Sequence, residues 1–193
     1  MPSNHSAAHA TQAGETDVIP AHADHLIVNG ELADINAWCV SYTEETLPEQ
    51  RPAFVPLALW QAHRTEEELA PLLASDTLIG PALAAELDRA SAIAIDFPAF
   101  TDGRGYTLAR LLRERFGYQG EIRAVGDVLV DQLDYMRRCG FTAMALRHDQ
   151  HPEDALRAIN AISVRYQPDV ELRQAMFERR QAQPAEREML ACS

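Results

Sequence analysis

The residues best suited to chemistry lie in one polar loop, Thr101-Asp102-Gly103-Arg104-Gly105. Its two glycines let the backbone approach a ligand closely, and the helix expected after it offers unpaired N–H groups and the positive end of its dipole. Arg104 adds a guanidinium that can bind a carboxylate, phosphate, sulfite or sulfate through two hydrogen bonds. The loop therefore predicts a small-oxyanion site that contains Asp102, Gly103, Arg104 and Gly105.

Two other interpretations of this loop stay open. Its glycines could simply make a tight turn, with Asp102 capping the helix and pairing with Arg104. The pattern Gly103-x-Gly105, with Asp127 farther along the chain, also matches part of a dinucleotide-binding fingerprint. Because Leu108 stands at the third glycine position of that fingerprint, the match is incomplete, and no resident cofactor is predicted.

Other polar residues at or just beyond the predicted strand ends are expected to gather near this loop: His63, Asp96, Asp127, Arg147 and His148. Arg123 would join them if its side chain faces the same edge of the sheet. Asp96 is the candidate acid–base group, since partial burial at the end of an apolar strand would raise its pKa. The alternative for Asp96 is a buried carboxylate that accepts an N–H from the neighbouring loop.

The segment His148-Asp149-Gln150-His151 carries two imidazoles and a carboxylate, which could bind a metal or act in acid–base catalysis. It directly precedes Pro152, however, and no H-E-x-x-H pattern accompanies it, so a polar loop entering a helix is the favoured interpretation. No metal site is predicted.

The elements that must position these residues alternate along the chain. The apolar runs predict strands at 57–60, 77–80, 93–97, 122–125 and 142–146. The apolar stripes and end signals predict helices at 65–73, 82–90, 106–116 and 127–140 and from Pro152 onward. Three prolines mark 47–56 as a connector, and Asn29-Gly30 predicts a hairpin within 25–32.

This alternation predicts the α/β class, with a mainly parallel sheet of about five strands and flanking helices, preceded by a small N-terminal hairpin. The sheet could be open or a partial, barrel-like β/α array. Composition divides the chain into a disordered tail at 1–24, a single domain at 25–167 and a polar helical tail at 168–193.

Charge and cysteine content exclude several classes of protein. A formal net charge of -12 argues against nucleic acid and anionic membranes as partners. Cys39, Cys139 and Cys192 contain no C-x-x-C pair, so they are neither a disulfide framework nor a zinc or iron–sulfur ligand set. Without a membrane-length apolar run or a signal-peptide pattern, the expected location is the cytoplasm.

The segments FPAFTDGRG, RAVGDVLVDQ and RCGF resemble the signature of a bacterial family known as domain of unknown function 934. The similarity extends from about residue 26 to residue 166 and is densest across 97–141. The resemblance implies a role beside sulfite reductase in assimilatory sulfur metabolism, where members are sometimes described as oxidoreductases. The family supplies no established catalytic residues.

These observations leave three functional hypotheses. The first is a cytoplasmic accessory protein of sulfite reduction, which binds sulfite reductase, its electron donor or a small oxyanion. The second is a small-molecule enzyme with Asp96 as the acid–base group and with Arg104 and Arg147 holding an anionic substrate. The third is a structural subunit whose glycine loop is only a turn.

Overall fold

The computed structural model describes residues 18–19, 25–33, 37–161 and 169–170 of the chain. Its strands are β1 (Val18–Ile19), β2 (Leu26–Val28), β3 (Glu31–Leu32), β4 (Cys39–Ser41), β5 (Ala53–Pro56), β6 (Leu69–Leu73), β7 (Ala92–Phe97), β8 (Glu121–Gly126) and β9 (Ala143–Ala145). Its α-helices are α1 (Leu57–Ala62), α2 (Pro81–Leu87), α3 (Arg104–Arg110), α4 (Leu133–Cys139) and α5 (Pro152–Asn160). A π-helical turn, η1 (Leu111–Arg115), follows α3, and a 3-10 turn, η2 (Val130–Gln132), precedes α4.

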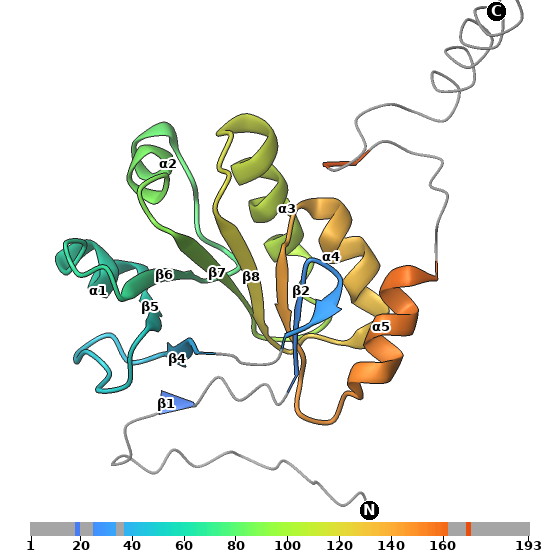
Figure 1. Cartoon of the computed structure of the whole chain (residues 1–193). Coiled ribbons are helices and arrows are strands. Elements are labelled where there is room, and N and C mark those ends of the chain that lie inside the picture. Colours follow the sequence, from blue (N-terminus) through green and yellow to red (C-terminus); the bar gives the residue numbers. More distant parts are fainter. Residues whose placement is uncertain (1–17, 20–24, 34–36, 162–168, 171–193) are drawn as a thin grey trace, which may run out of the picture.

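The strands form one curled sheet in the order β1-β4-β5-β6-β7-β8-β9-β2-β3 (Figure 1). Strands β4 to β9 run parallel to their neighbours. The two margins are antiparallel, with β1 on β4 at one side and the β2–β3 hairpin on β9 at the other. The α/β class is confirmed, and the curl corresponds to the barrel-like alternative. The sheet has more strands than the five or so predicted: the expected N-terminal hairpin forms one antiparallel margin, but the pairing of β1 with β4 at the other margin was not predicted.

From β7 onward the elements follow the periodicity of the sequence. In β7, Ile93 and Ile95 are buried on one face and Ala94 on the other, as in a parallel strand covered on both sides. Gly140 ends α4 in a left-handed conformation with φ of 103°. The predicted hairpin is also present, with positive φ at both Asn29 and Gly30.

Before β7 several predictions are wrong. The segment 57–60 is helix α1, and the strand is the preceding β5, within the predicted connector. The segment 65–73 forms no helix and ends in β6, because Pro71 in a helix interior would remove a hydrogen bond and clash with the preceding turn. The segment 77–80 is a loop between β6 and α2.

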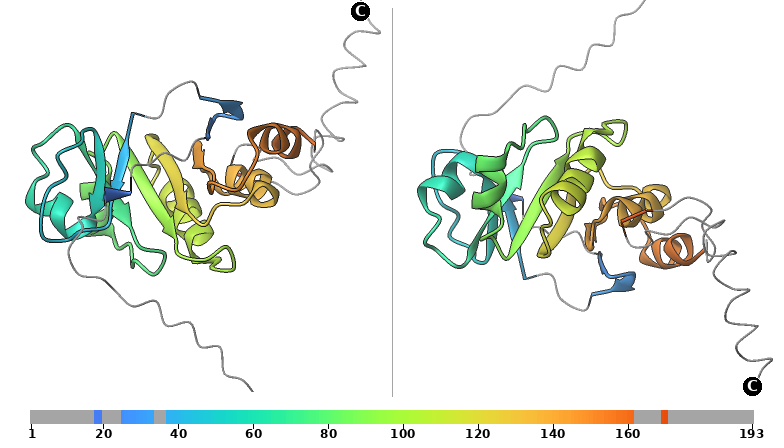
Figure 2. Two further views of the ribbon diagram at one scale, coloured as in Figure 1. Left: turned by 90° about the horizontal axis from the view of Figure 1, so that it is seen from below. Right: turned by 90° about the horizontal axis from the view of Figure 1, so that it is seen from above.

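The helices of the described residues cover one face of the sheet, and none of them lies on the other, concave face (Figure 2). The helix-facing core contains at least one buried residue from every α-helix, including Trp60, Leu87, Leu108, Met136 and Ile159. The core of the concave face is built from strand residues together with Trp38 and Ala33, which pack against them. Side chains that alternate along each strand therefore enter two different apolar environments.

Three large side chains occupy the concave face. The Trp38 and Phe54 rings are stacked with centroids 4.7 Å apart. The Arg123 guanidinium lies 5.1 Å from the centroid of the Phe54 ring. This contact joins β8 to β5 past the two strands between them, which requires strong curvature of the sheet. The surrounding strands carry small buried residues that leave room for these groups: Ala70, Ala92, Ala94, Ala143 and Ala145.

Parts of the predicted tails lie outside the described residues. Two residues of the stretch 1–24 form β1 and pair with Ser41 and Val40 of β4. The predicted helix in 168–193 falls on residues that the structure does not describe, apart from 169–170, which are not helical. The domain boundaries stay a prediction. Among the described residues, no helix is long and apolar enough to cross a membrane.

Candidate functional site

The carboxyl ends of the parallel strands and the loops that follow them meet at one edge of the sheet, the place where α/β proteins bind ligands. We call this the strand-end edge. Its loops are 42–46 after β4, 74–80 after β6, 98–103 after β7, 127–129 after β8 and 146–150 after β9. Strand β5 passes directly into α1 and contributes no loop.

Asp96 lies at the end of β7 and points to the concave face, because Ile95 and Phe97 on either side of it belong to the helix-facing core. The Tyr42 hydroxyl donates a 3.0 Å hydrogen bond to Asp96 Oδ1. In a flat sheet, β4 and β7 would be about 14 Å apart, so this bond depends on the curl. Burial raises the pKa of Asp96, the Tyr42 bond opposes the rise and the charge of Asp102 adds to it. The site therefore favours the protonated form of this carboxyl more than water does.

Gly126 allows β8 to pass close to the same carboxyl. Its φ of 91° lies in the left-handed region that favours glycine. A Cβ at this position would lie 2.8 Å from Asp96 Oδ1 and 2.5 Å from the Phe97 carbonyl oxygen. Any side chain here would push apart the ends of two neighbouring strands, so this glycine helps to define the site.

Asp102 joins the loops after β6 and β7. It accepts a 2.6 Å hydrogen bond from the Ser75 hydroxyl and bonds of 2.9 and 2.7 Å from Nε and Nη2 of Arg104. The Arg104 backbone N–H also donates to it, at 3.1 Å. These bonds hold the pKa of Asp102 well below its usual range, and they raise the pKa of Arg104. The geometry is that of the turn interpretation, in which Asp102 pairs with Arg104.

Arg147 joins the loops after β8 and β9. Its Nη1 donates to Asp127, and its Nε and Nη2 donate to the two oxygens of Asp149 at 2.7 Å each. These bonds raise the pKa of Arg147 and hold the pKa of Asp149 low. Asp127 also accepts the Phe100 backbone N–H at 2.8 Å, which ties the loop after β7 to the loop after β8.

The structure thus places five of the predicted site residues at the strand-end edge: Asp96, Asp102, Arg104, Asp127 and Arg147. His148 is exposed in the loop after β9. Gly103 is the N-cap of α3 and has a negative φ of -79°, and Gly105 is buried within α3 against the Phe97 ring, so neither glycine is required by a positive φ.

Two predicted residues lie elsewhere. Arg123 is only 4% exposed and sits on the concave face in the middle of β8. Its Nε donates to Glu121 Oε1 at 2.7 Å, toward the beginning of the strand, so it faces away from the edge. His63 follows helix α1, not a strand, and lies 3.1 Å from Glu66 at the opposite end of the sheet.

Sequence reasoning missed Tyr42 and Ser75. Both follow strands that the apolar pattern did not predict, β4 and β6, so neither was expected at a strand end. The available signal was Pro71, because a proline inside 65–73 contradicts a helix and leaves a strand that ends before Ser75.

Ion pairs between the charged side chains of this edge limit the chemistry that it can perform. The two arginines predicted to bind an anion are already bonded to carboxylates, so a small oxyanion would have to share or displace those bonds. Within the described part of the chain, no group of three His, Cys, Asp or Glu side chains could hold a metal ion. Asp96 is the one predicted edge acid whose pKa is raised, and it is hydrogen-bonded to a tyrosine.

The fold and the edge define a curled β/α protein whose parallel strands end at an acidic, internally paired surface. Residues 72–177 match the model of the family described as bacterial protein of unknown function (DUF934). The chain belongs to this family, which confirms the membership that its motifs indicate. No curated protein and no solved structure matches the chain.

Proposed function

We propose that this protein is a cytoplasmic accessory protein of assimilatory sulfite reduction, which docks onto sulfite reductase or its electron donor through the strand-end edge. The family resemblance supports the choice of pathway, and the surface of the strand-end edge supports docking as the mode of action. One observation carries the docking mode: three loops of the edge expose large apolar side chains. Tyr42 is 38% exposed, Phe100 50% and Leu78 91%.

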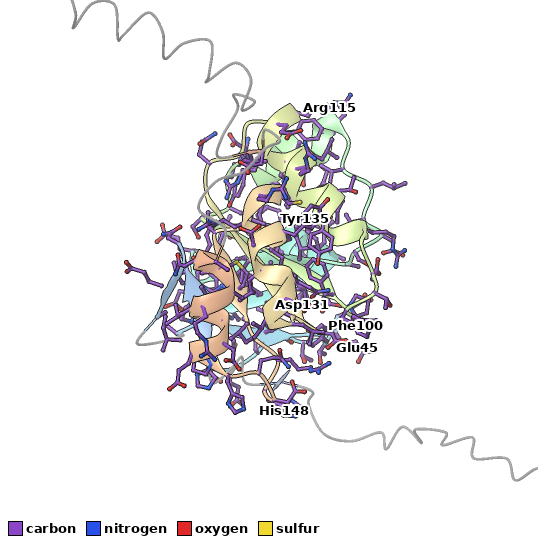
Figure 3. The ribbon with its side chains drawn as sticks, turned by 90° about the vertical axis from the view of Figure 1, so that its right-hand side faces the viewer. Glu45, Phe100, Arg115, Asp131, Tyr135 and His148 are labelled. Atoms are coloured by element: carbon purple, nitrogen blue, oxygen red, sulfur yellow. The ribbon has the colours of Figure 1, made fainter. Side chains whose placement is uncertain are left out.

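Exposed apolar side chains from neighbouring loops are typical of protein interaction surfaces. The loops of Leu78 and Phe100 are tied together by the Ser75–Asp102 hydrogen bond. Exposed acids accompany them, including Glu44, Glu45 and Asp76. Figure 3 shows Phe100 and Glu45 at the same end of the molecule. Such a surface fits a partner with an apolar patch and a basic rim.

The test is a binding measurement between purified protein and purified sulfite reductase or its electron donor. We expect Leu78→Ser and Phe100→Ser each to weaken binding about ten-fold or more, since buried apolar anchors dominate interface energy. Leu32→Ser is the matched control, because Leu32 is also exposed (42%) but lies on β3 at the hairpin margin. Equal affinity for all variants, or unchanged growth of a deletion strain on sulfate, would refute the proposal.

A second candidate, a small-molecule enzyme, is favoured by the raised pKa of Asp96. A carboxyl that binds a proton more tightly than usual suits general acid–base catalysis, and the Tyr42 hydroxyl beside it could relay or orient a proton. Asp96→Asn would then abolish turnover of an anionic substrate while the fold survives. A fully active variant would eliminate this candidate.

A further inference from the structure

A groove runs along the outer surface of α3 and η1 and is bordered by Tyr135 of α4. It has a volume of about 670 Å³, and its lining includes Tyr106, Arg110, Leu111, Glu114, Arg115 and Tyr135. We call it the α3–α4 groove. In Figure 3, Tyr135 lies in the middle of this face and Arg115 at the end opposite Phe100 and Glu45. The groove therefore extends away from the strand-end edge.

The lining residues repeat at helical spacing. They fall at 103, 106 and 107, 110 and 111, and 114 and 115, which is one face of a helix over three turns. At 1.5 Å per residue, this face is about 18 Å long. Its last turn is the π-helical η1, a form found mostly as single-turn insertions and often at functional sites. The length and spacing fit a partner helix of about twelve residues lying along α3.

The floor of the groove is aromatic and held in place by the core. The Tyr106 and Tyr135 ring centroids are 5.0 Å apart. On its other side, Tyr106 packs edge-on against the buried Phe97 ring at 5.2 Å. Tyr135 nevertheless remains 48% exposed. Tyrosines that are already ordered make effective anchors for a partner, because little side-chain freedom is lost on binding.

The charge of the groove is opposite to that of the strand-end edge. Arg110 bonds to Glu114 with its Nη2 2.8 Å from Oε1. Arg115 is exposed and lies over the Phe116 ring at 5.6 Å, and within the described residues no carboxylate forms an ion pair with it. An unneutralised arginine on the wall of an aromatic groove is distinctive in a chain with a net charge of -12.

We propose that the α3–α4 groove binds an acidic amphipathic helix of a second protein, whose apolar side chains cover Tyr106 and Tyr135 and whose carboxylate pairs with Arg115. The protein then presents two docking surfaces of opposite charge, and it can hold two partners at once. This inference does not depend on the identity of the partner at the strand-end edge.

The test uses the full-length protein with a photo-crosslinking phenylalanine derivative in place of Tyr135, irradiated in its native cells. The crosslinked segment is mapped by mass spectrometry and then synthesised as a labelled peptide. Its affinity for wild-type protein is compared with that for Tyr135→Ala and Arg115→Glu by fluorescence anisotropy. Arg89→Glu, an exposed arginine on the α2 side of the molecule, is the matched charge-reversal control.

We expect the crosslink to map to an acidic amphipathic segment of another protein. Its peptide should bind at least ten-fold more weakly to both groove variants and equally well to Arg89→Glu, Leu78→Ser and Phe100→Ser. The last two variants separate this site from the strand-end edge. The inference would be overturned if the crosslink formed to a second copy, to the chain's own tail, to a segment without acids or to nothing. It would also be overturned if the peptide bound Arg115→Glu and the wild type with equal affinity.

Discussion

Gly105→Ala tests whether the contact between α3 and β7 outweighs the helix propensity of alanine. A Cβ here would lie 2.7 Å from Cζ of Phe97 and about 3 Å from both Cε atoms. The Phe97 ring is fully buried and packs at 5.2 Å from Tyr106 and 5.8 Å from Phe141, so it cannot move aside freely. Overpacking costs about 1–3 kcal/mol, and alanine gains about 1 kcal/mol over glycine in a helix. We expect a net loss of up to about 2 kcal/mol.

The assay is urea unfolding, with Gly103→Ala as the control. Gly103 has helical angles (φ -79°, ψ -3°), and the nearest atom to its added Cβ is Tyr106 Cδ2 at 4.0 Å. Because Gly103 is the N-cap of α3, a position where alanine is less favourable than glycine, and its added Cβ meets no close neighbour, that variant should lose no more than about 1 kcal/mol. Phe97→Leu removes the colliding ring, so Gly105→Ala should cost less in that background. If Gly105→Ala costs as much in the Phe97→Leu background as in the wild type, the packing argument is wrong.

Two further predictions concern the carboxyls of the edge, both measured as urea midpoints against pH. Asp102→Asn should be less stable than the wild type at pH 7. Because the folded-state pKa of Asp102 is lowered, the difference should shrink as pH falls below the ordinary Asp value of about 3.9. A pH-independent difference would contradict this. Asp96→Asn keeps an acceptor for Tyr42 and removes a partly buried charge, so it should be at least as stable as the wild type at pH 7. The raised pKa destabilises the folded wild type only at a pH where Asp96 of the unfolded chain is ionised, so the stability advantage of Asp96→Asn should disappear at acid pH. If the stability of the variant relative to the wild type is lower at pH 7 than at pH 4, this reasoning is wrong.

The half of the chain from β7 onward was largely predictable from its sequence. There each strand is a compact apolar run, and helix ends carry clear signals such as Gly140. The earlier half was not, because local signals conflicted with tertiary packing. Glu66, Glu67 and Glu68 resemble the first turn of a helix, yet the apolar residues after them enter the sheet as β6, with Pro71 inside the strand.

The site residues that lie at the ends of clearly marked strands were predictable from the sequence. The contacts that depend on the curvature of the sheet were not. Asp96 lies near the end of a strand that the sequence specifies clearly, and Asp102 lies in the loop that follows this strand. Tyr42 reaches Asp96 only because the sheet curls past two intervening strands, and a one-dimensional pattern contains no such information. The pairing of Arg147 with two aspartates likewise depends on the neighbourhood of β8 and β9.

The concave face connects the misplaced Arg123 to the edge. A curled sheet can hold a ligand in its interior when that interior is empty, but here Trp38, Phe54 and Arg123 occupy it. Burial lowers the pKa of Arg123, and the neighbouring Glu121 opposes that shift. A buried cation of this kind gives little net stability compared with apolar packing, but its contact with the Phe54 ring links β8 to β5 across the concave face.

The curvature of the sheet makes this contact possible, and it makes a second contact possible as well. The contact of Arg123 with Phe54 spans from β8 to β5, and the bond of Tyr42 with Asp96 spans from β4 to β7. Both contacts cross the concave side and need the same curvature, while the alanines of the central strands give the large groups space to meet. Arg123 therefore contributes to the strand-end edge indirectly, because it helps to stabilise the curvature that brings Tyr42 and Asp96 into contact.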